Sequence, residues 1–290
     1  MTYDLVIGDR AYSSWSLRGW LFFDAFGIPV KTHSARLYTD ELPTLLRQYP
    51  PARTAPTMRT PEGTVVPETI AIAEELATRH PDAGLWPSPP KARAIARALA
   101  AEMHAGFTAL RSHCPMNLRV SYTDCAPPPE VLADLARLDT IWSWARAETR
   151  SATPWLCGPY SVADAMFAPV ATRIATYNLP VTPAAMDYVM AHLAHPSFRR
   201  WRAVGMVDGA DQDFYRRPYP RRDWPGPTPL SARAVQGAQA ENTACPYSGK
   251  PVTHVLELDG HRFGFCNAFC RDKTAADPEA WPQFMALYQS

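Results

Sequence analysis

The sequence predicts an α/β domain, then an all-α helical domain, then a small cysteine-rich tail made of a β-hairpin and a helix. Strand and helix patterns alternate over residues 1–82, whereas residues 91–204 carry almost continuous helical periodicity. Three of the six cysteines lie in the tail, which covers residues 244–290. A Pro/Arg-rich linker over 205–243 separates this tail from the helices.

A chain of 290 residues is long enough for two domains, or for one domain with appendages. Its formal net charge of +1 predicts neither a nucleic-acid partner nor attraction to an anionic membrane. No apolar run approaches the ~20 residues that span a bilayer, and MTYDLVIGDR lacks the basic and long apolar regions of a secretory signal. We therefore expect a cytoplasmic protein whose cysteines are reduced thiols or metal ligands.

The elements of the first domain follow from the spacing of apolar residues. YDLVIG predicts a buried strand, and the apolar residues from Leu17 to Ala25 recur at helical spacing. VKTHSARL predicts a second strand, and ELPTLLRQY a helical patch. APTMRT and TVVP flank a PEG turn, as in a β-hairpin, and ETIAIAEELATRH predicts an amphipathic helix. The order β-α-β-α-β-β-α is that of a thioredoxin-like domain.

The second domain is predicted from four helical segments that follow a proline-rich linker at 80–92. The first helix covers residues 91–113 with its apolar side chains on one side. The others lie in PEVLADLARLDTIWSWARAE, SVADAMFAPVATRIATY and PAAMDYVMAHLA. In the third, Ser161 and Asp164 form a capping box with a structural role.

Residues 205–243 show little periodicity, so we expect an extended linker there. The arginines between positions 199 and 222 are expected to be solvated, because Asp208, Asp211 and Asp213 interrupt any basic stripe. Beyond the linker, HVLELDGHRFGF predicts a hairpin with Asp-Gly at its turn.

Three serines cluster in AYSSWSLRGW, where the first strand meets the first helix. A helix N-terminus offers unpaired N–H groups and the positive end of its dipole, which together stabilise an anion. A serine hydroxyl at this place could donate a hydrogen bond to a thiolate. The alternative is that Ser14 or Ser16 simply caps the helix, and the cluster taken alone favours capping.

Two further segments offer ligand-binding groups. Pro56 enters a hairpin strand after Ala55 and could form a cis peptide bond, leaving the Ala55 backbone N–H and C=O free. Glu68 and Thr69 open a helix, where a hydroxyl and helix-terminal N–H groups can hold a carboxylate and Glu68 can accept from an ammonium group. The alternatives are an edge-strand proline and ordinary helix capping.

Together these motifs resemble the glutathione S-transferase superfamily over residues 3–202. SSWSLR is similar to the serine motif of the theta and zeta classes, PARTAP to the cis-proline segment, and PETIAI to the Glu-Ser motif that binds the γ-glutamyl end of glutathione. GPYSVADA resembles the capping box of the helical domain, and HLAHPSFRRW the end of that domain. The combination of SSWSLR with AEMHAGF and PMN looks closest to a bacterial zeta-like branch.

The resemblance implies a GST-type helical domain, and it implies roles for individual residues. Ser13 would activate the glutathione thiol, with Ser14 and Tyr12 as alternatives, which leaves capping to Ser14 or Ser16. Pro56 would be the cis-proline, and the Ala55 backbone would bind the cysteinyl part of glutathione.

The same resemblance assigns the two ends of glutathione. Glu68 and Thr69 would hold the γ-glutamyl carboxylate and amine, with Thr69 in place of the usual serine. Thr54 stands where the family usually has a lysine, and Arg53 beside it is a candidate glutathione contact. The candidate residues of the second-substrate pocket are Tyr12, His104, Phe107 and Arg111. For His104, the alternative is a buried or surface histidine without a functional role.

Such a site supports attack of a thiolate on an electrophilic carbon, with no metal required. The product is a thioether, or the adduct collapses after bond rotation and gives cis-trans isomerisation. Zeta relatives include maleylacetoacetate isomerases and dehalogenating transferases, and the family also implies a homodimer. The alternative function is a non-catalytic, GST-like scaffold that carries a metal-sensing or interaction module.

The cysteines of the tail predict a metal site. Cys266 and Cys270 lie four positions apart, on one face of a helix, and a hairpin would bring them to Cys245 in CPYSGK. Tetrahedral zinc prefers four N or S ligands, so His261 or His254 would supply the fourth. The alternative is a hydrophobic appendage with incidental thiols, but a segment of about 50 residues rarely has enough core by itself.

The tail also resembles the small treble-clef metal-binding modules of the TRASH and YHS type. The similarity lies in CPYSGKPV, FCNAFC and DPEAWPQF. It implies a link to heavy-metal sensing or trafficking, with zinc expected first and copper second.

Overall fold

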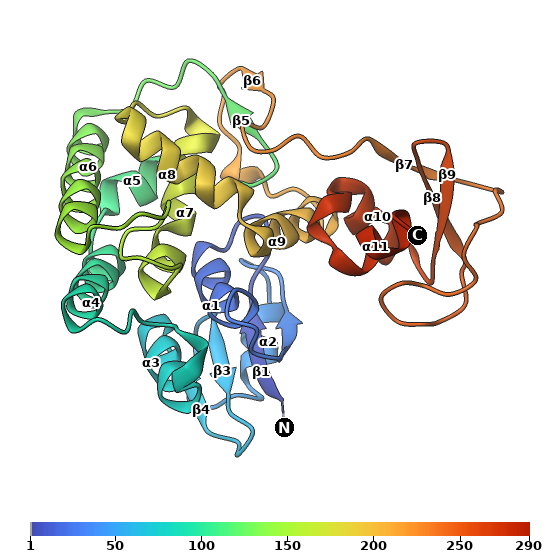
Figure 1. Ribbon diagram of the computed structural model, residues 1–290, viewed down its shortest axis with the longest axis horizontal. Coiled ribbons are helices and arrows are strands. Elements are labelled where there is room, and N and C mark those ends of the chain that lie inside the picture. Colours follow the sequence, from blue (N-terminus) through green and yellow to red (C-terminus); the bar gives the residue numbers. More distant parts are fainter. Residues whose placement is uncertain (1) are drawn as a thin grey trace.

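A four-stranded sheet organises the first domain of the computed structural model, which describes residues 2–290 (Figure 1). Its strand order is β2-β1-β3-β4, with β1 parallel to β2 and antiparallel to β3. The elements are β1 (Tyr3–Ile7), α1 (Ser14–Asp24), β2 (Val30–Ser34), α2 (Glu41–Leu46), β3 (Thr57–Arg59), β4 (Val65–Pro67) and α3 (Thr69–Arg79). This order confirms the predicted thioredoxin-like domain.

Helix α1 packs between this sheet and the helical domain, so almost its whole length is buried. Gly19 permits the close approach of α1 to the chain before β3. A Cβ at that position would lie 2.7 Å from the Cβ of Pro56, well inside van der Waals contact. The Ala55–Pro56 peptide bond is cis, as predicted, and Pro50–Pro51 is a second cis bond that was not predicted.

The second domain is helical, as predicted, and α7 forms its centre. Every residue of α7 is buried, because the helix is surrounded by α1, α4 and α8. After the short 3-10 helix η1 (Pro81–Ala83), the elements are α4 (Pro90–Ala105), α5 (Thr108–His113), β5 (Ser121–Tyr122), α6 (Pro129–Thr149), α7 (Val162–Tyr177), α8 (Pro183–Ala194) and α9 (Pro196–Val207).

Two features of this domain differ from the prediction. The helix expected over 91–113 is broken between α4 and α5, where Phe107 adopts a left-handed φ of 58°. A Cβ at Gly106 would lie 2.9 Å from the carbonyl oxygen of Glu102, so this glycine suits the break. Helix α9 was not predicted separately, although Phe198, Trp201 and Val204 recur at helical spacing on its buried face.

The segment after α9 is anchored to the body of the protein. The 3-10 helix η2 (Asp213–Tyr215) buries Tyr215, and β6 (Arg221–Arg222) pairs with β5. β7 (Ala232–Val235) then joins the sheet of the tail, through β8. Much of the expected linker is therefore held by contacts between residues far apart in the sequence.

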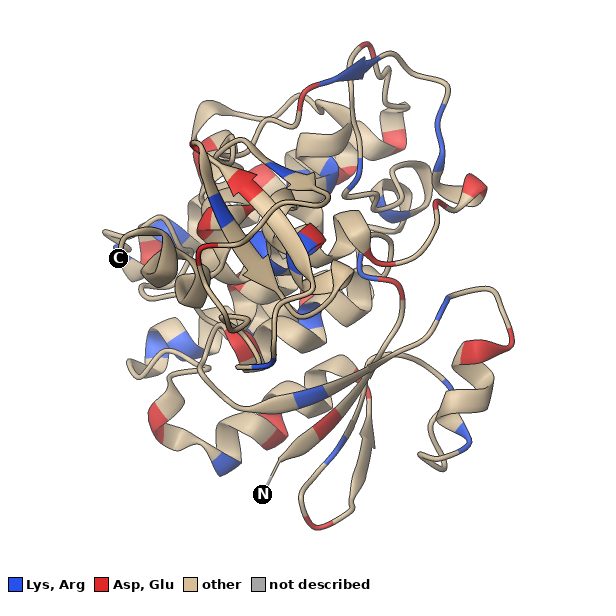
Figure 2. Cartoon of the chain, turned by 90° about the vertical axis from the view of Figure 1, so that its right-hand side faces the viewer, with Lys and Arg blue, Asp and Glu red and all other residues tan. Residues whose placement is uncertain are grey.

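The expectation that the arginines near α9 are solvated is wrong for three of them. Arg199 donates to both carboxylate oxygens of Asp277, at 2.8 and 2.7 Å. Arg200 donates to Asp24, and Arg202 donates to the Leu118 carbonyl. Elsewhere, Lys and Arg residues are interspersed with Asp and Glu along the chain (Figure 2).

The tail forms a three-stranded sheet of order β7-β8-β9, and its helix α10 packs between this sheet and α9 (Figure 1). Its apolar cluster includes Phe263, Phe265 and Phe284, and it extends to Ala203 and Val204 of α9. The hairpin with Asp-Gly at its turn is confirmed. The elements are β8 (His254–Leu258), β9 (His261–Phe265), α10 (Ala268–Ala276), η3 (Pro278–Ala280) and α11 (Pro282–Tyr288).

None of the helices within residues 2–290 has the length and apolar composition needed to cross a membrane.

The predicted capping box at the start of α7 is confirmed. The fully buried carboxylate of Asp164 accepts hydrogen bonds from Leu156 N at 3.1 Å, Ser161 N at 2.9 Å and Tyr188 Oη at 3.0 Å. It therefore ties the loop before α7 to α8 as well as capping the helix.

We predict that Asp164→Ala lowers the free energy of unfolding by about 3 kcal/mol, because several buried donors lose their acceptor. Urea denaturation followed by circular dichroism measures the change. The matched control is Asp187→Ala on exposed α8 surface, for which a change below about 0.5 kcal/mol is expected. Equal losses in the two variants would contradict the role given to Asp164.

Candidate functional site

A cavity of about 530 Å³ opens between the first domain and the helical domain. In the first domain, its walls come from the start of α1, the loop after β2 and the segment before β3. In the helical domain, they come from α5 with the chain that follows it, and from α7. The segment after α9 completes the lining. Six residues predicted to belong to the site line it together: Tyr12, Ser13, Ser14, Arg53, Ala55 and Arg111.

Ser13 is the N-cap of α1, so the assignment of capping to Ser14 or Ser16 is wrong. The Ser13 Oγ accepts from Ser16 N at 3.3 Å and donates to Ser16 Oγ at 2.7 Å. The Ser16 Oγ in turn accepts from Gly8 N at 2.9 Å. The helix begins one residue earlier than a cap at Ser14 would require, and the Ser13 hydroxyl proton is used within this network.

Ser14 is the first residue of α1, and it faces the same cavity. Its Oγ accepts a hydrogen bond from Nη2 of Arg173 at 3.4 Å. Among residues 2–290, no acceptor takes the proton of the Ser14 hydroxyl. This hydroxyl can therefore donate to a ligand atom in the cavity, with the N-terminus of α1 behind it.

Glu68 and Thr69 lie at the start of α3, outside the lining of this cavity. Glu68 adopts φ 132°, a conformation that costs an L-residue about 1–3 kcal/mol, and such strain concentrates at functional sites. Its carboxylate accepts from Ile70 N at 3.0 Å, so it is held over the helix N-terminus. The Thr69 side chain is buried beside it.

His104 connects this acidic group to the cavity wall, although His104 itself is not part of the lining. Its Nε2 lies 3.6 Å from Oε1 of Glu68, and its ring packs edge-on against Trp15, which does line the cavity. Phe107 was expected to line the second-substrate pocket. It is instead buried in the core at the break between α4 and α5, and it does not line the cavity.

The segment of residues 208–216, which we call the strap, borders one side of the cavity through Phe214 and Tyr215. Tyr215 stacks on Tyr12 with 4.5 Å between ring centroids, and Phe214 stands exposed at the rim. The Tyr12 hydroxyl donates to Asp211 at 3.4 Å and accepts from Gln212 N at 3.3 Å. Because the strap engages this hydroxyl, Tyr12 suits a wall of the site better than a thiol donor.

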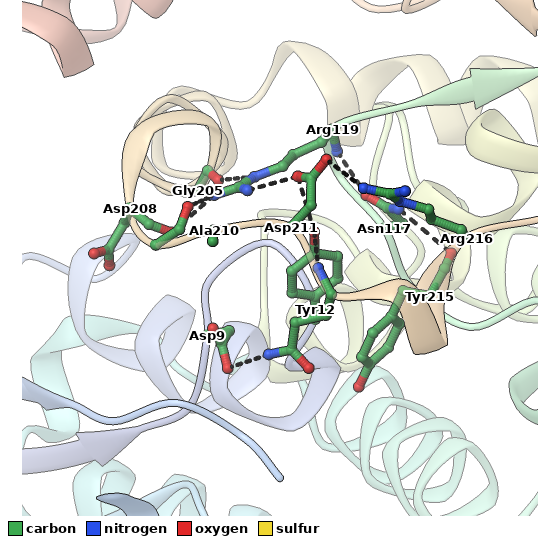
Figure 3. Close-up of polar contacts among 12 residues, drawn as sticks. Asp9, Tyr12, Asn117, Arg119, Gly205, Asp208, Ala210, Asp211, Tyr215 and Arg216 are labelled. Atoms are coloured by element: carbon green, nitrogen blue, oxygen red, sulfur yellow. Dashed lines mark hydrogen bonds and ion pairs between the residues drawn. The ribbon is translucent and has the colours of Figure 1, made fainter. Parts of the chain in front are cut away.

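Arg119 fastens the strap to the helical domain (Figure 3). Its guanidinium donates to Asp211 and to the carbonyl oxygens of Gly205, Asp208 and Gly209, each at 2.8 Å. At the other side, Gln212 donates to Asp9 at 2.8 Å. Asp9 also accepts from the backbone N–H of Leu37.

The sequence did not single out Phe214, Tyr215 or Arg173 as site residues. The strap has no periodic pattern, and Arg173 stands within the apolar sequence of α7. The one available signal for Arg173 was a charged residue in an otherwise apolar helix.

The three cysteines of the tail meet, as predicted. Their sulfur atoms all lie within 4.8 Å of one another. Cys245 sits in a tight turn closed by hydrogen bonds to Lys250 and Gly249, and Cys270 lies in the first turn of α10. Burial raises the pKa of the Cys245 thiol, but hydrogen bonds, chiefly from the backbone of Cys266 and Tyr247, lower it to about 7. Burial and the neighbouring sulfurs of Cys245 and Cys266 raise the pKa of the Cys270 thiol to about 11, so metal binding there would release a proton.

The expected histidine ligands are not part of this cluster. His261 lies at the far end of β9 from Cys266, and its Nδ1 is 3.1 Å from the carboxylate of Glu241. His254 contacts Thr253 instead. The Cys266 sulfur accepts hydrogen bonds from the Ser248 hydroxyl at 3.2 Å and from Asn267 Nδ2 at 3.4 Å.

With this geometry, the comparison with known proteins is direct. Residues 12–79 match the family described as glutathione S-transferase, N-terminal domain. The chain has the glutathione transferase fold. No curated protein matches it.

Three solved structures illustrate this fold. A glutathione transferase homologue from Burkholderia GL BGR1, with bound glutathione, has 21% identity and a TM-score of 0.52, over 69% of this chain and 96% of its own. A glutathione transferase from Methylococcus capsulatus has 19% identity and a TM-score of 0.53, over 70% and 98%. Glutathione transferase Omega 3C from Trametes versicolor has 17% identity and a TM-score of 0.54, over 74% and 92%.

We predict that Ser13→Ala lowers the free energy of unfolding by about 1 kcal/mol, because α1 loses its cap. Ser14→Ala is expected to change it by less than about 0.5 kcal/mol, because Ser14 Oγ makes one long hydrogen bond. Urea denaturation of both variants measures the difference. A larger loss in Ser14→Ala would contradict the capping role of Ser13.

Proposed function

We propose that this protein is a glutathione transferase that works in the cavity between its first two domains. The observation that carries the proposal is the meeting of the Ser14 hydroxyl, the N-terminus of α1 and the Ala55 backbone at one cavity. Within residues 2–290, neither the N–H nor the C=O of Ala55 has a hydrogen-bond partner, so both are open to a peptide-like ligand.

Glutathione is proposed to lie across this surface in an extended form. Its cysteinyl backbone pairs with Ala55, as a strand pairs with a sheet edge. The γ-glutamyl group reaches the start of α3, where the strained Glu68 accepts from the amine and helix N–H groups bind the carboxylate. Arg53, which lines the cavity beside Ala55, would bind the glycine carboxylate.

The thiol is proposed to ionise beside Ser14, which differs from the assignment of Ser13. The α1 dipole and the Ser14 hydroxyl, which donates to the sulfur, favour the thiolate, and the released proton goes to solvent. The thiolate electron pair forms a C–S bond with the electrophilic carbon of the second substrate. The leaving group departs with its bonding pair, and the product is a thioether.

The zeta-like isomerase is the variant of this mechanism in which no group leaves. The electron pair of the attacked double bond moves into a conjugated carbonyl, the new single bond rotates, and the C–S bond breaks to return the thiolate. The sequence motif SSWSLR supports this variant. The zeta-like class, the homodimer and the cytoplasmic location stay predictions.

We predict that Ser14→Ala lowers kcat/KM for conjugation of glutathione to chlorodinitrobenzene by about 10²-fold, because the thiolate loses its hydrogen-bond donor. Ser13→Ala is the matched control, and a loss below about tenfold is expected, through the weakened helix start. A large loss in Ser13→Ala with normal Ser14→Ala activity would return the role to Ser13. Absence of conjugation, together with no retention on glutathione resin, would contradict the transferase itself.

We also propose that Cys245, Cys266 and Cys270 bind one metal ion, with zinc first and copper second. Their converging sulfurs support this, since three thiolates fit either ion. The ion would cross-link the turn at Cys245 to the start of α10. Three cysteines would fill three of the four coordination positions of the ion, and water or another donor would fill the fourth. A metal-sensing or interaction module on a transferase-like scaffold is the second candidate function, and this cluster is the observation that favours it.

We predict that purified protein contains about one equivalent of metal and that Cys266→Ser lowers this content at least several-fold. Elemental analysis by plasma mass spectrometry measures it. Cys125→Ser is the matched control, because Cys125 lies in the helical domain, outside the cluster. An unchanged metal content in Cys266→Ser would refute the site.

A further inference from the structure

Among residues 2–290, three arginines gather behind Ser14 with no carboxylate in ion-pair contact. Arg18 of α1 and Arg173 of α7 are 0% and 4% exposed, and Arg111 of α5 is half-buried. Burial lowers the pKa of all three, and repulsion by the other arginines adds to this for Arg18 and Arg173. A buried cation without a counter-ion is costly, and such groups concentrate at functional sites.

Trp15 holds two of these arginines in place. The Cζ of Arg18 lies 4.4 Å from the Trp15 ring, and the Cζ of Arg111 lies 4.9 Å from it. Arg18 also donates from Nε to the Met166 carbonyl, while its two terminal nitrogens have no hydrogen-bond partner in the described chain. The indole face partly offsets both charges, but it supplies no anion.

Arg173 is fixed by three hydrogen bonds and forms part of the cavity wall. It donates to the carbonyl oxygens of Cys114 at 2.9 Å and Pro169 at 3.1 Å, and to Ser14 Oγ at 3.4 Å. Arg111 lines the same cavity and, within residues 2–290, makes no hydrogen bond to Ser13 or Ser14. Besides Arg53, two guanidinium groups therefore border the cavity, one beside Ser14 and the other on α5, and within residues 2–290 no carboxylate is among the residues that line it.

We infer that this end of the cavity binds an anionic group of the second substrate, and that the substrate class is a carboxylate-bearing electrophile with an apolar body. A guanidinium fork matches a carboxylate in geometry and charge, which a neutral electrophile does not exploit. The apolar body would lie against the strap, where Phe214 is 65% exposed at the rim. The inference rests on the proposed function, because it takes Ser14 as the site of the thiolate.

The competing role for these arginines is stabilisation of the glutathione thiolate itself. In that case, removing a charge slows attack on every electrophile to the same extent. If the charge serves the second substrate, the loss is confined to electrophiles that carry an anion. A matched pair of substrates that differ in one charge separates the two roles.

The experiment compares a chlorodinitrobenzoate with its methyl ester, using the full-length protein and glutathione. Each kcat/KM is divided by the uncatalysed rate constant of the same compound. We expect the wild-type protein to favour the carboxylate at least about tenfold. Arg111→Gln should remove this preference, because kcat/KM for the carboxylate is expected to fall at least about tenfold more than kcat/KM for the ester. Arg111→Lys, which keeps the charge without the fork, should restore part of it.

Arg137→Gln is the control, because this arginine lies exposed on α6 in an ion pair with Glu102. It should leave the preference unchanged. Equal wild-type rates for the two compounds would overturn the inference. So would an equal loss for both compounds in Arg111→Gln, since that result assigns the charge to the thiolate.

A binding measurement decides the inference even if the protein forms no thioether. Calorimetry compares unreactive dinitrobenzoate with its methyl ester, for wild type and Arg111→Gln. Tighter binding of the carboxylate, lost in Arg111→Gln, supports the anionic subsite although the proposed transferase fails. Equal affinity for both compounds overturns the subsite, whatever the activity.

Discussion

The site depends on the short hydrogen-bond chain that joins Gly8 N, Ser16 Oγ and Ser13 Oγ, because this chain decides where α1 begins. The buried hydrogen bonds among these three groups link the two ends of the turn between β1 and α1. As a result, Ser13 becomes the cap and Ser14 becomes the first helical residue that faces the cavity. Moving the cap by one residue would place a different hydroxyl at the end of the helix dipole.

The same helix also brings the two domains together. Its glycine face permits the close approach of the cis-proline segment, and its other faces pack against α3, α7 and α9. The cavity is therefore bordered by residues from both domains and by the strap. Because Arg119 and Gln212 hold the strap on opposite sides, the chain beyond α9 forms part of the site wall rather than a separate appendage.

The fold could be predicted from the sequence where a local pattern specifies it. The alternation of strands and helices, the Asp-Gly hairpin and the capping box at Asp164 were of this kind. The choice between Ser13 and Ser14 was not, because it depends on a one-residue helix boundary that periodicity does not resolve. The contacts of the strap were also hidden, since Tyr12 and Tyr215 meet across about two hundred residues of chain without a shared motif.

In the tail, too, some features could be predicted from the sequence and others could not. The three cysteines converge as their spacing indicated, yet His261 fails as a ligand because an extended strand carries it about 16 Å from Cys266. The tail also has more apolar core than its own length predicted. Ala203 and Val204 of α9 complete its apolar cluster, and the Arg199–Asp277 pair ties it to the body, so docking contributes stability besides any metal.

The central claim is that the start of α1, with Ser14 at its first position, ionises the glutathione thiol. Ultraviolet absorbance of the thiolate, recorded while the pH of the protein–glutathione complex is varied, tests it without any second substrate. The account predicts that the thiol of bound glutathione titrates at a lower pH than that of free glutathione, and that Ser14→Ala moves the titration back toward the free value. A bound thiol that titrates like the free one in the wild-type protein would contradict it.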